Sequence, residues 1–236
     1  MEVQIAVSKV KKYATSTSGD TVEVIERPNG GLSIVMADGQ SSGRGAKWVS
    51  SFVVRKVISL LAEGVRDGAS ARAASDALFT ERGGKVSATL NILSVDMLTK
   101  TLVITRNNPA PVLLAYDEDI KLLDEPSVPV GIYRDTRPLI TELPLRTGMT
   151  VVIFTDGIVH AGSRDGRVME ADTCLKSILE DGDPSAQEIT DSLLEHAIKL
   201  DQGRPVDDTS VIALRVTTRI SENMIRRMVV RLPIGF

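Results

Sequence analysis

The stretch that decides the fold is Ser33-Ile34-Val35-Met36-Ala37-Asp38-Gly39-Gln40-Ser41-Ser42-Gly43. An apolar run of strand type ends in an acid and then in a turn rich in glycine and serine. A helical period begins directly after Gly43, so the run reads as a buried strand with an exposed end. Asp38 directs a carboxylate outward from that end, and Gly39 leaves its own carbonyl unobstructed by a side chain.

The same pattern recurs twice further along the chain. Residues 151–157 read VVIFTDG, and residues 206–214 read VDDTSVIAL, with two acids just before an apolar strand. Carboxylates at the tips of separate strands give a fold the oxygen ligands that Mg²⁺ or Mn²⁺ prefers. One cysteine and two histidines exclude a zinc site built from those residues.

Composition bounds the possible functions. The 236 residues are 42% hydrophobic, which suits one globular domain. A net charge of -3 and 3% aromatic residues leave no electrostatic or stacking case for nucleic acid. No run reaches the ~18 apolar residues of a membrane span, and the N-terminus has no signal-peptide pattern. We therefore expect no nucleic acid or membrane partner and a cytoplasmic location.

Hydrophobic periodicity predicts the order strands, two helices, many strands, two helices, one strand. Closely spaced strands favour antiparallel pairing, so the predicted fold class is α+β: a four-layer αββα sandwich of two antiparallel sheets flanked by helix pairs. We expect strands at 3–10, 21–26, 32–37, 88–95, 101–105, 112–115, 120–123, 139–143, 149–154 and 210–216, and helices at 44–64, 70–80, 169–179 and 185–200.

Three local predictions accompany these elements. Ser70 is a plausible N-cap of the second helix. Ser185 and Glu188 have the spacing of a capping box at the last helix. The turn-rich segment 27–31 predicts a hairpin, which would bring Asp20 at the start of one strand close to Asp38 at the end of its neighbour.

The chain reads as one domain over residues 1–217, followed by an extension over 218–236. The extension carries Arg219, Arg226, Arg227 and Arg231 among apolar residues. An extra helix or edge strand covering the sandwich would explain this pattern, and so would a docking or dimer segment. A membrane-surface helix is the remaining alternative. We expect the extension to pack on the domain or to mediate contacts.

Five motifs in this order resemble the metal-dependent serine/threonine protein phosphatases of the PPM family. The likeness runs from about residue 18 to 216, and it is greatest to the bacterial sporulation and stress-response branch, which includes stressosome phosphatases. The family fold is itself an αββα sandwich. The motifs are Ser18-Gly19-Asp20, Ala37-Asp38-Gly39-x-Ser41-Ser42-Gly43, Ala88-Thr89, Phe154-Thr155-Asp156-Gly157 and Asp207-Asp208-Thr209-Ser210.

The resemblance implies a role for each matching acid. Asp38 would bridge two Mn²⁺ or Mg²⁺ ions, and Gly39 would offer its carbonyl to one of them. Asp156 and Asp207 would hold the other ion, and Asp20 would lie near the first. Asp38, Asp156 and Asp207 are thus the expected catalytic residues. Each acid alone could equally be a turn or cap residue.

Three further residues have open roles. Asp208 would orient its neighbour, although either Asp207 or Asp208 could be the ligand. Arg44 could reach the substrate phosphate or simply be solvated. Asn108 lies in a segment that resembles a family turn near the site, and it could equally belong to a rigid turn.

The implied reaction is hydrolysis of phosphoserine and phosphothreonine. A phosphate monoester is anionic and hydrolyses very slowly, and two divalent ions can neutralise its charge and activate a water. The implied substrates are phosphorylated bacterial signalling proteins, in particular stressosome proteins of the STAS-domain type. The alternatives are a phosphatase of anti-sigma-factor antagonists, a phosphatase of small phosphoesters, and a catalytically weak binding module with the same fold.

Two positions depart from patterns found in this family. Some members carry a histidine just after the central Asp-Gly pair, where this chain has Gln40. The acid that protonates the leaving oxygen would then be a metal-bound water or a residue that the sequence does not name. His160 follows Asp156 closely, and it reads either as a proton donor or as an ordinary surface histidine.

Overall fold

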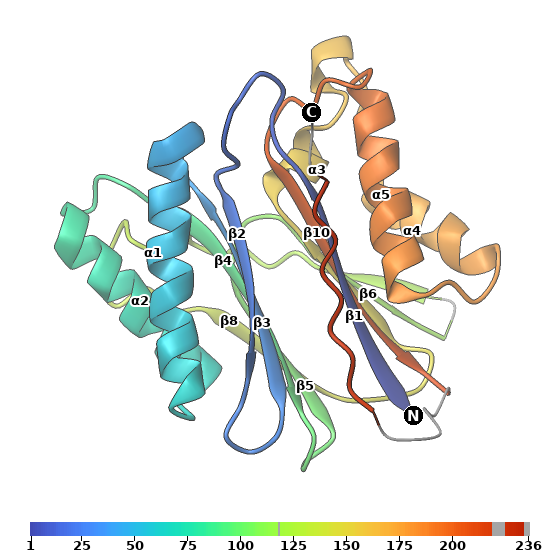
Figure 1. Ribbon diagram of the computed structural model, residues 1–236, viewed down its shortest axis with the longest axis horizontal. Helices are drawn as coiled ribbons and strands as arrows, with labels where there is room; N and C mark the ends of the chain where they lie inside the picture. Colours follow the sequence, from blue (N-terminus) through green and yellow to red (C-terminus); the bar gives the residue numbers. More distant parts are fainter. Residues whose placement is uncertain (118, 219–224, 234–236) are drawn as a thin grey trace.

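The computed structural model describes residues 1–117, 119–218 and 225–233. Two antiparallel sheets pack face to face within these residues, with α1 and α2 over one outer face and α4 and α5 over the other (Figure 1). The predicted four-layer αββα sandwich is therefore confirmed. No helix of the described part is long and apolar enough to cross a membrane.

The two sheets are built from different parts of the chain. The first sheet has the strand order β2-β3-β4-β5-β8, and the second has the order β1-β10-β9-β6-β7. The first comprises β2 (Asp20–Glu26), β3 (Leu32–Gly39), β4 (Ala88–Asp96), β5 (Thr101–Asn107) and β8 (Leu139–Pro144). The second comprises β1 (Glu2–Val10), β10 (Thr209–Thr217), β9 (Thr150–Phe154), β6 (Val112–Tyr116) and β7 (Asp119–Leu123).

The helices agree with the periodicity except at two places. They are α1 (Gly43–Ala62), α2 (Asp67–Arg82), α3 (Asp156–His160), α4 (Ala171–Glu180) and α5 (Ala186–Leu200), with a 3₁₀ turn at Ser163–Asp165. The short helix α3 was not predicted, because five residues are too few to show a helical period. The capping box of Ser185 and Glu188 is present.

Ser70 is not the N-cap of α2, so that prediction was wrong. The helix begins one turn earlier, at Asp67, with Arg66 in the cap position. The Ser70 hydroxyl donates to the Arg66 carbonyl from inside the first turn. Asp67 favours this earlier start because an acid near a helix N-terminus is stabilised by the helix dipole, and it also pairs with Arg27 at 2.8 Å.

Strand alternation separates the core into an inter-sheet layer and two helix-facing layers. On β3, Ile34 and Met36 belong to the inter-sheet cluster, whereas Val35 and Ala37 pack under α1 and α2. The inter-sheet row therefore continues to Asp38 at the end of the strand. The same rule places three polar residues at the ends of other inter-sheet rows: Asp20 beyond Val22, Thr155 beyond Ile153 and Ser210 beyond Ile212.

The described part of the C-terminal extension has no regular structure. Residues 219–224 and 234–236, including Arg219, lie outside the described residues. Residues 225–233 are exposed and form neither helix nor strand, so the expected helix or edge strand is absent from them. Arg226 pairs with Glu26 at 3.3 Å and donates to the Gly30 carbonyl, which attaches this part to the β2–β3 hairpin.

Candidate metal and phosphate site

Asp20 and Asp38 face each other at the end of the inter-sheet core. They are register partners in the β2–β3 pair, as the hairpin prediction expected. Asp20 is fully buried, and its Oδ2 accepts hydrogen bonds from Ser210 Oγ at 2.6 Å and Thr155 Oγ1 at 3.2 Å. These two donors come from the second sheet, so Asp20 ties the two sheets together. Its Oδ1 is buried without a hydrogen-bond partner among the described residues.

The acidic side chains at this end of the inter-sheet core lie close enough to repel one another when charged. Burial and, to a smaller extent, the neighbouring Asp20, Asp156 and Asp207 together raise the pKa of Asp38 to about 9. Burial also raises the pKa values of Asp20 and Asp156. Like charges directly opposite each other on a sheet are destabilising. A cation placed among these carboxylates would relieve both the burial cost and the repulsion.

Asp156 and Asp207 lie just beyond strand ends at the same end of the second sheet. Asp156 is the first residue of α3, directly after β9, and its Oδ1 is buried without a partner in the described part of the chain. Asp207 lies two residues before β10 and pairs with Lys12 at 3.7 Å. Both side chains are partly exposed, and both influence the pKa of Asp38.

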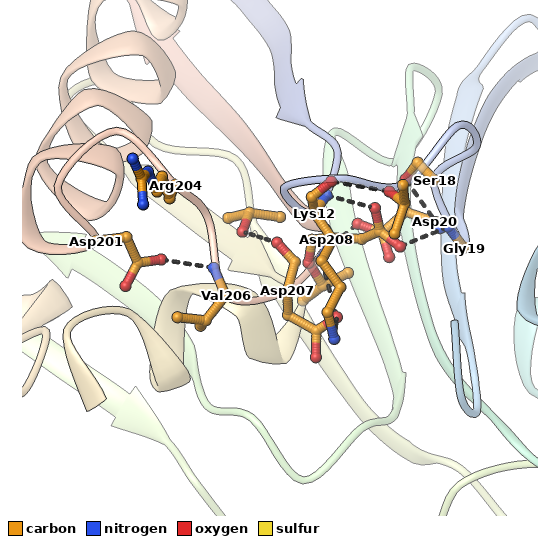
Figure 2. A network of polar contacts seen from close by, with 12 residues as sticks. Lys12, Ser18, Gly19, Asp20, Asp201, Arg204, Val206, Asp207 and Asp208 are labelled. Atoms are coloured by element: carbon orange, nitrogen blue, oxygen red, sulfur yellow. Dashed lines mark hydrogen bonds and ion pairs between the residues drawn. The ribbon is translucent and has the colours of Figure 1, made fainter. Parts of the chain in front are cut away.

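The Asp208 carboxylate binds the backbone at both ends of the loop over residues 12–19 (Figure 2). It is 3% exposed, and its two oxygens accept from the backbone N–H groups of Lys12 at 2.9 Å and Gly19 at 2.7 Å. The Asp208 N–H donates to Asp207 Oδ1 at 2.9 Å. Both Asp208 oxygens thus accept a backbone N–H, whereas Asp207 Oδ2 accepts no hydrogen bond from a described residue.

Asp201 supports the same loop from the end of α5. Its carboxylate accepts from the backbone N–H group of Val206 at 2.9 Å (Figure 2). It also accepts from the Gly162 N–H at 2.8 Å. It thereby joins the segment after α3 to the segment before Asp207. Sequence reasoning missed this residue, because an acid following a helix gives no signal beyond that of an ordinary turn.

Close backbone contacts explain two glycines of the motifs. A Cβ on Gly39 would collide with the backbone of Ala46 in the first turn of α1. A Cβ on Gly157 would collide with the Asp208 carbonyl and the Thr209 hydroxyl. Each glycine therefore lets an acid-bearing segment pack directly against a neighbouring segment.

Two lysines near Asp20 were also missed. Lys9 Nζ and Lys47 Nζ both donate to the Asp20 carbonyl, at 3.1 and 2.8 Å, and Lys47 also donates to the Thr21 hydroxyl at 2.8 Å. Burial lowers the pKa of Lys47. These contacts attach β1 and α1 to the strand that carries Asp20. A lysine in a strand pattern (Lys9) or in an amphipathic helix pattern (Lys47) looks like a solvated residue, so the sequence offered no sign of these contacts.

The remaining candidates lie around the acids. Arg44 is exposed in the first turn of α1. Asn108 is 1% exposed, and its amide donates to the Phe154 carbonyl at 3.2 Å, which braces the chain just before Asp156. The Gln40 side chain accepts from the Ser87 N–H and hydroxyl. His160 is exposed, and its charge lowers the pKa of Asp156 against the larger effect of burial.

The donor set fits a hard divalent cation in type and charge. Within the described ranges, no group of three or more His, Cys, Asp or Glu side chains is arranged so that it could hold a metal ion. The acids nevertheless supply only hard oxygen donors, and two of their buried oxygens, on Asp20 and Asp156, lack a protein partner. Mg²⁺ and Mn²⁺ prefer such ligands and keep several waters, so they do not require a cage formed only by protein atoms.

Two antiparallel sheets between helix pairs are the fold of PPM-type phosphatase domains. The family described as Stage II sporulation protein E (SpoIIE) matches residues 28–217. This match covers most of the sequence, so the chain belongs to that family. The predicted resemblance to the sporulation and stress-response branch is confirmed.

Solved structures of this class share the fold. The phosphatase domain of SpoIIE from Bacillus subtilis, with a fragment of its regulatory domain, is 18% identical with a TM-score of 0.79. The alignment covers 92% of this chain and 64% of that one, less than two thirds of its length.

Two metal complexes of phosphatases are also similar. RsbX in complex with magnesium is 16% identical over 91% of this chain and 96% of its own, with a TM-score of 0.67. The catalytic domain of the serine/threonine phosphatase PstP with two manganese ions is 15% identical over 91% and 98%, with a TM-score of 0.69. No curated protein matches the sequence.

Proposed function

We propose that this chain hydrolyses phosphoserine and phosphothreonine on bacterial signalling proteins, with the help of two Mn²⁺ or Mg²⁺ ions. One observation carries the proposal: carboxylates from both sheets meet at one end of the sandwich, and Asp38 lies close enough to Asp20, Asp156 and Asp207 for all three to raise its pKa. A protein without a cation to bind there would gain no stability from such mutual repulsion.

Some residues of the site would bind the ions, and others keep those residues in position. Asp38, Asp156 and Asp207 would hold the ions, and Gly39 would contribute its carbonyl. Asp20, the register partner of Asp38, would add negative charge close to the ions. The ions supply the positive charge and the activated water that phosphate monoester hydrolysis needs. The Asp208 carboxylate keeps the loop over residues 12–19 in place by accepting two backbone hydrogen bonds, and the Asp208 N–H orients Asp207 by donating to its Oδ1.

The proposed protein substrates are more specific than the proposed reaction. The motif resemblance to the stress-response branch favours phosphorylated STAS-domain proteins of the stressosome, and such partners place the reaction in the cytoplasm. The partly exposed Asp156 and Asp207 suit a phosphorylated residue displayed on a folded protein, because that residue needs an open site. Anti-sigma-factor antagonists are the second class of protein to assay.

The test is metal-dependent turnover. The purified chain should hydrolyse p-nitrophenyl phosphate with Mn²⁺, and a chelator should abolish the activity. Asp38→Asn should lower kcat/KM by at least about a thousandfold, since it removes a charge on which ion binding depends. Asp119→Asn, at an exposed acid on the edge strand β7, is the matched control and should leave the rate unchanged. Metal-independent turnover, or none, would contradict the proposal.

Phosphoproteins separate the remaining alternatives. Phosphorylated STAS-domain proteins should lose phosphate, followed by mass spectrometry, with a kcat/KM well above that for p-nitrophenyl phosphate. A preference for small esters would point to a small-molecule phosphatase instead. Tight binding of the phosphoprotein without loss of phosphate would identify a binding module.

A further inference from the structure

A surface groove of about 560 Å³ runs along the outer side of α1. Its residues come from that helix, except for Thr17 in the loop that Asp208 secures. The groove therefore begins beside the acidic site and follows the helix away from it. The side chains that matter for its chemistry are Arg44, Lys47, Trp48, Phe52, Arg55 and Lys56.

The groove is strongly cationic in a protein whose net charge is -3. No acidic residue is among the described residues that line it. The side chains of Arg44, Arg55 and Lys56 make no ion pair and no hydrogen bond with any described residue. Arg55 and Lys56 are exposed side by side in the middle of α1. Unpaired cations concentrated along one helix favour an anionic partner.

An aromatic pair lies between the cations. Trp48 is 38% exposed, and its ring stacks on Phe52 with 5.3 Å between the ring centroids. The Arg82 guanidinium, at the end of α2, lies 4.0 Å from the centre of the Trp48 ring and adds positive charge beside the groove. A partner that matches this surface combines acidic groups with an apolar side chain, and an acidic peptide segment does so.

The position of the groove connects it with the proposed reaction. Arg44 lies six residues after Asp38, directly beyond the turn at the end of β3. From Arg44 to Ser59 the helix extends by about 22 Å, which an extended peptide of about six or seven residues would span. A phosphorylated residue at the acids could thus be followed by a segment lying along α1.

We infer that this groove binds an acidic segment next to the phosphorylated residue of the protein substrate. The inference rests on the proposed function and adds a sequence preference to it. Acidic side chains of the segment pair with Arg55, Lys56 and Arg44, and an apolar side chain packs on Trp48. The groove contributes to substrate binding and takes no part in the chemical step.

Two phosphoserine peptides test the preference. One carries acidic residues and a leucine after the phosphoserine, and the other has glutamine in place of each acid. We expect the acidic peptide to have a KM at least about tenfold lower at low salt, with kcat nearly unchanged, and raising the salt should reduce the difference because charge pairs at a surface are screened. Equal KM values would overturn the inference.

Charge reversal localises the effect. Arg55→Glu/Lys56→Glu should remove the preference for the acidic peptide while turnover of p-nitrophenyl phosphate stays the same. The control, Arg72→Glu/Lys121→Glu, makes the same change in net charge at two exposed cations outside the groove and should keep the preference. If both variants lose it equally, the effect is one of overall charge and the inference fails.

Binding can also be measured without catalysis, because Trp48 is the only tryptophan of the chain. An unphosphorylated acidic peptide should change its fluorescence, and Arg55→Glu/Lys56→Glu should abolish the change. This readout separates the two proposals: inactivity toward every phosphoester would defeat the proposed function, whereas an unchanged fluorescence would defeat the groove. Stronger binding of single-stranded DNA or of anionic lipid vesicles than of the peptide would also overturn the assignment to a protein segment.

Discussion

The two sheets deliver their acids to the site in different ways. In the first sheet, Asp20 and Asp38 are strand residues held opposite each other by the ladder. In the second sheet, Asp156 and Asp207 lie just outside the strands and depend on loops for their position. Acids in a ladder are placed firmly but repel each other, whereas acids on loops can adjust to a cation but need separate support. The site thus combines a rigid half, with Asp20 and Asp38, and an adjustable half, with Asp156 and Asp207.

The largest effect should come from the rigid half. Gly39→Ala directs a methyl group at the backbone of Ala46, and backbone cannot rotate away as a side chain can. We expect a loss of about 3 kcal/mol or more in the free energy of unfolding, measured by denaturant titration. Gly45→Ala is the matched control, because a Cβ on Gly45 would meet nothing within 4 Å. Gly45 lies in α1, next to the Ala46 backbone with which Gly39→Ala would collide. Gly45→Ala should be neutral or slightly more stable, and similar losses in both would show that the close contact does not matter.

A smaller effect should come from the loops of the second sheet. Asp208→Ala leaves the Lys12 and Gly19 N–H groups without their acceptor, so the free energy of unfolding should fall by about 2–3 kcal/mol. Asp207→Ala, whose contact with Lys12 is partly exposed, should cost less than about 1 kcal/mol. In assays with Mn²⁺, Asp207→Ala should lose more activity than Asp208→Ala relative to the stability that each variant loses. The reverse pattern would make Asp208 the ligand.

The last effect concerns protons in the metal-free protein and is measured as a pH dependence of the melting temperature. The pKa of Asp38 is about 9 in the folded state, above the ordinary value of an aspartate, so the folded protein holds a proton that the unfolded chain has released. Its contribution to stability is therefore present at low pH and is lost as the pH rises toward 9. With a chelator present, the melting temperature should fall over this range, and Asp38→Asn should flatten the fall.

Mn²⁺ should act in the opposite direction. The ion competes with protons for the carboxylates, so the stabilisation that it brings should increase as the pH rises. This measurement tests the comparison between the two halves directly, because proton release at Asp38 belongs to the rigid sheet. A metal-free melting temperature that stays constant with pH, in the protein and the variant alike, would contradict it.

Much of the molecule could be predicted because its signals are local. Short apolar runs between turn residues identified the strands, and the turn at residues 27–31 predicted that Asp20 lies close to Asp38. Other features were hidden because they depend on partners far away in the chain. Nothing near Asp208 indicates that its oxygens bind Lys12 and Gly19, and nothing near Lys47 indicates the Asp20 carbonyl. Ser70 was misread because Asp67 could begin the helix one turn earlier.

The amino-acid sequence alone determined the sandwich, its order of elements and the acids that end its strands. It could do so because side-chain period and turn chemistry act over a few residues. Only the tertiary structure decided which acid of the 207–208 pair supports the loop, how Asp20 joins the sheets through Thr155 and Ser210, and that unpaired cations line α1 beside the site. The first two features come from contacts between segments up to 196 positions apart, and no local pattern encodes such contacts.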